Sequence, residues 1–132
     1  MFEYHGWVSI QSSAGDETDS ELEAVYRAAQ DAVAELRRGA GLIDTRMVNG
    51  AAQLSLSGLL NHRGDEGQQV IDCFVRVGRV AAGSYGLLYI RDDEDSTGRD
   101  NEFQVMVMKR GKVTTTRDTN LSPCIPVIED DI

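Results

Sequence analysis

The chain has 132 residues, of which 41% are hydrophobic and 27% are charged. A chain of this length and composition can bury one sizeable core without disulfide or metal crosslinks, so we expect a single domain over residues 1–132. The 22 acidic and 13 basic side chains give a formal net charge of −9, which argues against nucleic acid or an anionic membrane as a partner and favours a basic macromolecule.

A strand and a long helix are predicted at the N-terminus. Residues 2–11 alternate between apolar and polar side chains, which is the period of a strand. Thr18 and Glu21 have the spacing of a capping box, and apolar residues then recur at helical spacing. Gly39 follows two arginines and suits a helix C-cap, so we expect one helix to continue to this glycine.

A hairpin and a second helix are predicted next. Residues 42–48 and 51–58 form two predicted strands, and Asn49-Gly50 between them favours the type I′ turn of a tight hairpin. Asp65 is expected to open a helix that has one apolar side and ends at Gly83.

Three strands and a tail complete the chain. The strands are expected over 84–91, 102–110 and 113–117, with a turn at Arg110-Gly111-Lys112, before a tail over 121–132. The order β-α-β-β-α-β-β-β predicts an α+β protein with a mostly antiparallel sheet and two helices on one face. A ferredoxin-like core with an added C-terminal hairpin is the simplest arrangement of these elements.

One face of the predicted sheet has no helix to cover it. The strands 84–91 and 102–110 carry apolar side chains on both faces, whereas the helices can cover only one. The second face therefore needs the apolar tail, a second copy of the chain or another partner. Trp7 lies on the face of the first strand opposite Phe2 and Val8, so it is expected on this second face.

Metal and cofactor sites are not indicated by residue spacing. The two histidines and two cysteines form no zinc motif. The segment that starts at Asp93 resembles a calcium loop superficially, but it has Gln104 where a bidentate Glu is required, and predicted strands rather than helices border it. We therefore expect no metal and no cofactor.

Signatures of catalysis and of export are also missing from the sequence. No GxSxG, GxGxxG or P-loop motif occurs, and neither Cys73 nor Cys124 has a His or Lys beside it that would activate the thiol. The chain is therefore not expected to be an enzyme. Its first residues do not form a cationic, apolar leader, so we expect a cytoplasmic protein in which both thiols are reduced.

An acidic segment between the fourth and fifth predicted strands is the main charged feature. Its six acidic residues outnumber three nearby bases, Arg91, Arg99 and Lys109. Like charges held together are costly, and a cationic partner would relieve that cost and accelerate encounter. We therefore expect a docking surface for a basic partner, the alternative being a solvated hairpin loop. The acidic residues are Asp92, Asp93, Glu94, Asp95, Asp100 and Glu102.

Three segments carry a family resemblance: FEYHGW at residues 2–7, GSYGLLYIRD at 83–92 and LSPCIPVIED at 121–130. Together, and in this order along nearly the whole chain, they resemble the immunity protein 7 family of bacterial polymorphic toxin systems. The resemblance implies a small cytoplasmic α+β protein that binds and neutralises a toxin domain, often a nuclease. It implies no catalytic residue and assigns no residue that contacts the toxin.

Toxin binding is expected to use two kinds of residue. Acidic residues would accelerate association, and exposed aromatic residues would anchor the complex. Many toxin nucleases have cationic grooves, which an acidic protein can fill as a phosphate mimic, while tightness comes from a desolvated centre. Trp7 and Tyr85 are the candidate anchors, with ordinary core packing as the alternative for both. Two other classes stay open: a ligand-binding or dimerising regulatory module, and a small enzyme with dispersed acidic residues.

Overall fold

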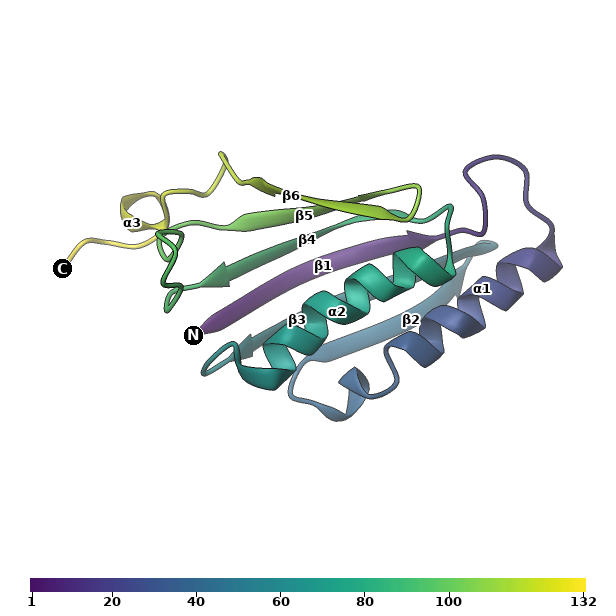
Figure 1. Ribbon diagram of the computed structural model, residues 1–132, viewed down its shortest axis with the longest axis horizontal. Coiled ribbons are helices and arrows are strands. Elements are labelled where there is room, and N and C mark those ends of the chain that lie inside the picture. Colours follow the sequence, from purple (N-terminus) through teal and green to yellow (C-terminus); the bar gives the residue numbers. More distant parts are fainter.

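Six strands form one sheet in the computed structural model, which describes all residues 1–132. The strands are β1 (Phe2–Ile10), β2 (Leu42–Val48), β3 (Ala51–Leu60), β4 (Tyr85–Asp92), β5 (Gln104–Lys109) and β6 (Lys112–Arg117). The helices are α1 (Asp19–Ala32), the 3-10 helix η1 (Leu36–Arg38), α2 (Gly64–Val80) and the short α3 (Cys124–Val127). Both α1 and α2 lie on one face of the sheet, and the two termini lie at the same end of it (Figure 1).

The strand order in the sheet is β2-β3-β1-β4-β5-β6, and every neighbouring pair is antiparallel. The predicted α+β class with a mostly antiparallel sheet is therefore confirmed. β5 and β6 form the added C-terminal hairpin and extend the sheet beyond β4. The ferredoxin-like description of the remaining core stays a prediction. No helix combines the length and the hydropathy that crossing a bilayer requires.

The first helix ends earlier than the sequence pattern predicts. Its capping box is present, because the Thr18 hydroxyl accepts a hydrogen bond from the backbone N–H of Glu21 and the Glu21 carboxylate accepts one from that of Thr18. The α-helix stops at Ala32, and η1 takes the place of its expected continuation to Gly39. The tighter winding of this 3-10 turn directs Leu36 into the core, where only 1% of it is exposed.

The bounds of the second helix also differ from the prediction. α2 begins at Gly64, so Asp65 lies inside the first turn and does not cap the helix. A carboxylate at this position still interacts favourably with the helix dipole. α2 ends at Val80, before Gly83, whose N–H donates instead to the backbone carbonyl of Gln11 at 2.9 Å. This hydrogen bond joins the segment before β4 to the end of β1.

The core lies between the sheet and the two long helices. One cluster of 21 buried residues includes side chains from β1, β3, β4, β5, α1 and α2. On β1, the apolar residues Phe2, Tyr4, Val8 and Ile10 are at most 1% exposed, which confirms the alternation predicted for residues 2–11. The helices thus cover one side of the sheet, and its other side has no long helix packed against it (Figure 1).

Tyr4 gives a test of this packing. Its hydroxyl is buried and forms no hydrogen bond with any protein group. Its side chain lies close to Gly58, where a Cβ would be 2.5–2.7 Å from ring and hydroxyl atoms of Tyr4. Because Tyr4→Phe removes only an unsatisfied polar atom, we expect urea denaturation to show an unchanged free energy of unfolding or a gain of up to about 1 kcal/mol. As a control, Tyr4→Ala should cost about 3–5 kcal/mol. A loss above about 2 kcal/mol for Tyr4→Phe would contradict this account of the hydroxyl.

Candidate functional site

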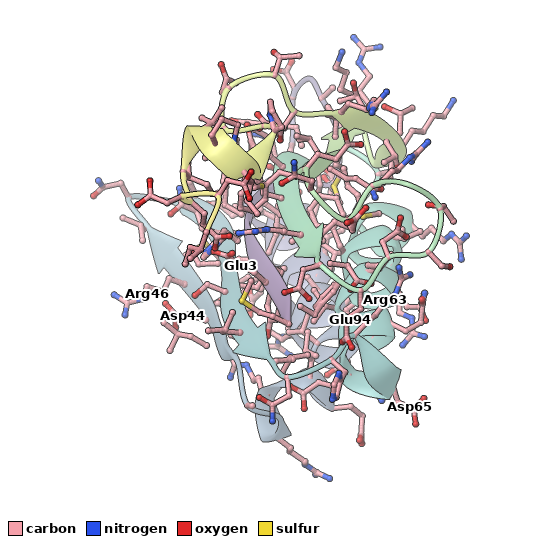
Figure 2. All side chains as sticks on the ribbon, turned by 90° about the vertical axis from the view of Figure 1, so that its left-hand side faces the viewer. Glu3, Asp44, Arg46, Arg63, Asp65 and Glu94 are labelled. Carbon is pink, nitrogen blue, oxygen red and sulfur yellow. The ribbon has the colours of Figure 1, made fainter.

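The sheet face opposite α1 and α2 is only partly covered, and we call it the open face. In Figure 2, Glu3 of β1 lies beneath α3, and Asp44 and Arg46 of β2 project on the side away from α2. The register of β1 and β4 places matched residues side by side on this face. The pairs are Glu3 with Arg91, His5 with Tyr89, Trp7 with Leu87, and Ser9 with Tyr85.

Trp7 and Tyr85 form an exposed aromatic pair on the open face. Their ring centroids are 6.0 Å apart and their planes meet at 88°, which is a T-shaped contact. Because 45% of Trp7 and 47% of Tyr85 are exposed, ordinary core packing is wrong for both residues. Edge-to-face contact is a favourable arrangement of two aromatic rings, so the sheet presents two contacting aromatic rings to solvent.

A hollow of about 350 Å³ opens beside this pair. Trp7, Leu42 and Tyr89 supply aromatic and apolar walls, and Ser55 and Ser57 add hydroxyl groups. Leu42 is 72% exposed, so its side chain stands free at the rim. These residues come from β1, β2, β3 and β4, and only the strand order of the folded sheet brings them together.

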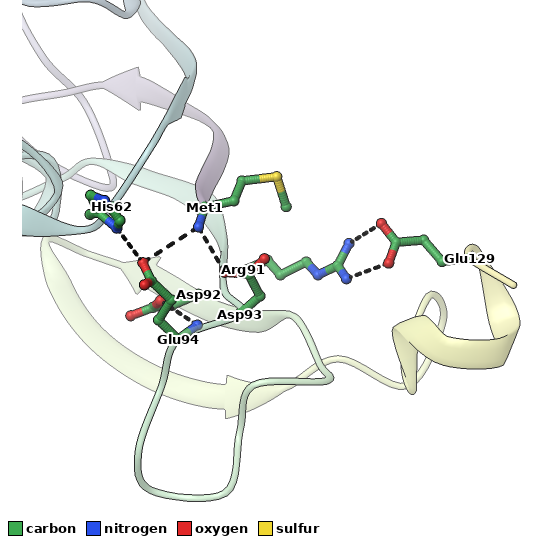
Figure 3. Close-up of polar contacts among 7 residues, drawn as sticks. All are labelled: Met1, His62, Arg91, Asp92, Asp93, Glu94 and Glu129. Carbon is green, nitrogen blue, oxygen red and sulfur yellow. Dashed lines mark hydrogen bonds and ion pairs between the residues drawn. The ribbon is translucent and has the colours of Figure 1, made fainter. Parts of the chain in front are cut away.

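The C-terminal segment covers the other end of the open face. Phe103 and Cys124 are buried there, and Arg91 has only 5% of its surface exposed. The Arg91 guanidinium donates two hydrogen bonds to the Glu129 carboxylate, at 3.1 and 2.9 Å (Figure 3). These bonds hold the pKa of Glu129 below its usual value. The sequence predicts that this face is covered by the tail, by a second copy of the chain or by another partner. The tail covers part of it and leaves Trp7 exposed.

The acidic residues that follow β4 are largely paired within the chain. The Met1 ammonium donates to Asp93 at 2.7 Å and lies 3.6 Å from the Glu94 carboxylate (Figure 3). His62 Nδ1 lies 2.6 Å from Glu94, and this hydrogen bond lowers the pKa of Glu94. The partners of this acidic segment therefore come from distant parts of the chain. Arg91, one of the three bases near this segment in the sequence, forms its ion pair with Glu129.

Two further acidic residues shape the loop itself. The Asp95 carboxylate accepts hydrogen bonds from the Thr97 hydroxyl at 2.6 Å, the Thr97 N–H at 3.1 Å and the Arg99 N–H at 3.0 Å. The hydroxyl contact is the main cause of the lowered pKa of Asp95. Asp92 accepts from the N–H of Glu94 at 3.0 Å. Much of the charge predicted for docking therefore also stabilises the turn.

The last two acidic residues differ from each other. Glu102 has 13% of its side chain exposed and forms an ion pair with Arg117 at 2.8 Å. Asp100 is exposed in the loop between β4 and β5. The predicted local excess of negative charge is therefore reduced by two cations from distant parts of the sequence, the Met1 ammonium and Arg117. Glu102 presents little surface to a partner.

The acidic segment and the aromatic pair lie at opposite ends of β4. This strand runs from Tyr85 to Asp92, and at about 3.3 Å per residue its ends are about 23 Å apart. The structure therefore does not bring the proposed steering and anchoring residues into one compact site. The two groups can act together only through a broad surface or through the long-range field of the charges.

The carboxylates of Asp92, Asp93 and Glu94 lie within 4.8 Å of one another. This is a different set from the one the calcium-like spacing indicated. Two of the three already interact with the Met1 ammonium, which supplies positive charge at this position. Cys73 and Cys124 are both buried, and burial raises the pKa of each thiol, so neither is primed as a nucleophile.

A second acidic segment was missed by the sequence interpretation. Residues 16–23 contain five acidic side chains in eight positions, and they lie where α1 begins, at the Tyr85 end of the sheet (Figure 1). The signal was present in the composition of this window. It was overlooked because the same residues also read as helix-capping residues. They are Asp16, Glu17, Asp19, Glu21 and Glu23.

Comparison with known proteins identifies one family. No curated protein matches the chain. The family model described as immunity protein 7 matches residues 1–130, which is nearly the full length and includes the aromatic pair, the acidic loop and the C-terminal segment. The resemblance carried by the three sequence segments is confirmed, and the chain belongs to the immunity protein 7 family.

Proposed function

We propose that this chain binds a cognate toxin domain of a bacterial polymorphic toxin system in the cytoplasm and neutralises it by stoichiometric binding, without a reaction of its own. The observation that carries the proposal is the family match over residues 1–130. The acidic character of the chain, with a net charge of −9, further suits a basic toxin such as a nuclease, whose cationic groove attracts anions.

In this proposal, acidic side chains accelerate the encounter and the aromatic pair holds the complex. Coulombic attraction acts over about a Debye length of 8 Å at physiological salt, so acidic residues outside the contact can still steer. The anchoring role falls to Trp7 and Tyr85, since exposed Trp and Tyr residues dominate binding energy at protein interfaces. The steering residues are Asp92, Asp93, Glu94, Asp95, Asp100 and Glu102.

A dimerising regulatory module is the second candidate, and the exposed aromatic pair is the observation that favours it. A surface with 45% of a Trp and 47% of a neighbouring Tyr exposed could bury itself against a second copy. Light scattering at micromolar concentration separates the candidates, since a monomer mass removes this one.

The direct test needs a cognate toxin domain, and we expect the reading frame immediately upstream to encode it. Its expression alone is expected to stop bacterial growth, and co-expression of this chain should restore growth. The purified chain should form an equimolar complex with the same domain after catalytic inactivation. Unrelieved toxicity, together with separate elution of the two proteins, would remove the proposed function.

The steering role predicts a kinetic effect. A triple variant of exposed loop residues, Asp93→Asn, Glu94→Gln and Asp100→Asn, should slow association about threefold to tenfold at low salt and leave dissociation unchanged. Its salt dependence should also be shallower, because fewer charges attract the toxin. Stopped-flow or surface-based kinetics measure both rates.

The matched control neutralises three acidic residues on the helices: Asp31→Asn, Asp65→Asn and Asp72→Asn. Both triple variants change the net charge by the same amount, so a difference between them reports the position of the charge. Equal association rates for the two variants, with equal salt dependence, would show that the loop after β4 has no special role in steering.

A further inference from the structure

We propose that the cognate toxin contacts the open face, with an apolar side chain of the toxin seated in the hollow beside Trp7. This inference rests on the proposed function and names the surface and the contact chemistry that the function would use. It adds Leu42, Ser55 and Tyr89 to the contact residues. It also places the acidic loop at the margin of the complex rather than at its centre.

The first argument is the composition of the surface. Single exposed apolar residues are ordinary on proteins, but here Trp7 joins two features, because it contacts Tyr85 and also lines the hollow with Leu42 and Tyr89. Interface centres are enriched in Trp and Tyr and depleted in charged residues. Hydroxyl groups of Ser55 and Ser57 in the hollow could bond to the backbone of a partner without adding charge.

The second argument is that the ionisable residues around the hollow already have partners within the chain. The His5 ring lies 2.7 Å from the Glu3 carboxylate. On β2, Asp44 forms an ion pair with Arg46. The ion pair of Arg91 with Glu129 closes the covered end. An ionic group of the partner would find no unpaired countercharge in the hollow, and an apolar side chain suits its aromatic and aliphatic walls better.

The third argument selects the toxin over a second copy of the chain. The loop after Asp92 is acidic, and the acidic residues 16–23 lie at the other end of the sheet, where α1 begins on the opposite face. Two copies that each carry a net charge of −9 repel one another as these ends approach. A basic domain seated on the open face would instead be attracted by the net negative charge and by the acidic loop at the Asp92 end of β4, so the charge of the chain is complementary to such a partner.

The test fills the hollow without disturbing the core. Ser55 is exposed and lines the hollow, so Ser55→Arg places a long side chain in it. Gln69→Arg is the matched control, since Gln69 is exposed on α2 and the charge change is identical. With the inactivated upstream-encoded toxin domain as the probe, Ser55→Arg should raise Kd by about 30-fold or more, mainly through faster dissociation. Gln69→Arg should stay within about twofold of the unmodified chain.

A second variant keeps the test valid if Ser55→Arg unfolds. Leu42→Ser changes a side chain that is 72% exposed, so the fold should tolerate it, and loss of this apolar wall should raise Kd about tenfold.

If the unmodified chain binds the toxin but both variants bind as tightly as Gln69→Arg, the open face is not the contact surface, while the proposed function stands. If the unmodified chain does not bind, the proposed function itself fails. A dimer that Ser55→Arg converts to monomer would assign the face to a second copy and overturn the inference.

Discussion

Replacing Gly78 by Ala is expected to lower the free energy of unfolding by about 2–3 kcal/mol. In most helix interiors the same change stabilises by about 1 kcal/mol, because Ala is the better helix former. Gly78 is buried in α2 and packs against Gly111 in the turn between β5 and β6. A Cβ at Gly78 would overlap the carbonyl oxygen of Gly111, which is a backbone atom and cannot rotate away. Steric overlap therefore reverses the usual sign.

The turn cannot easily move to accommodate the methyl group. The N–H of Gly111 donates to the backbone carbonyl of Ser84 at 2.8 Å, and its φ of 73° lies in the left-handed region that favours glycine. Thermal unfolding should show a midpoint about 10 °C lower for Gly78→Ala. Gly15→Ala is the control, because the nearest atom to a Cβ there is Ser13 Oγ at 3.9 Å. Equal midpoints for the two variants would contradict the close contact between α2 and the turn.

Asp118→Ala is the second substitution with a large expected effect, a loss of about 2–3 kcal/mol at neutral pH. Asp118 is 6% exposed, and its carboxylate accepts hydrogen bonds from the Asn120 N–H at 3.0 Å, the Leu121 N–H at 2.8 Å and the Ser122 hydroxyl at 3.0 Å. Ser122 Oγ in turn accepts from the N–H of Phe103 at 2.9 Å. One carboxylate therefore holds the turn that leads the C-terminal segment onto the open face.

The pH dependence of this effect has a defined sign. Burial disfavours the ionised form of Asp118, but the three hydrogen bonds outweigh burial, and the pKa of Asp118 lies below its usual value. A pKa that is lower in the folded state than in the unfolded state, about 3.9, contributes stability that is complete above that value and is lost as pH falls through the folded pKa. The difference between the unmodified chain and Asp118→Ala should thus be constant above about pH 5 and shrink below about pH 4.

Urea denaturation across this pH range measures the difference. Asp130→Ala is the control, since Asp130 is exposed near the C-terminus and should show no loss at neutral pH. If the loss for Asp118→Ala persisted unchanged in acid, the carboxylate charge would not be what holds the turn.

Local sequence signals predicted the elements well. The alternation of residues 2–11 and the capping box at Thr18 depend only on neighbours in the chain, and both are present. At the hairpin turn, Asn49 and Gly50 have φ values of 50° and 77°, as a type I′ turn requires. The ends of α1 and α2 were predicted less well, because packing of Leu36 and the contact of Gly83 with Gln11 decide them.

The candidate site was predicted less completely than the elements. Trp7 and Tyr85 were identified as residues of interest, but their exposure depends on which part of the sheet the C-terminal segment covers. The acidic loop was identified by composition, yet its pairing with Met1 and His62 depends on the strand order. The hollow could not be predicted, because it combines side chains from four strands.

By itself, the sequence determined the α+β class, the net acidity and the family, since periodicity, composition and motif order are properties of the chain read in one dimension. The tertiary structure alone decided which side chains meet. Met1 reaches Asp93 and Arg91 reaches Glu129 because the strand order brings distant segments to one end of the sheet. The same order leaves Trp7 and Tyr85 exposed at the other end, because the C-terminal segment packs over the Arg91 end of the open face.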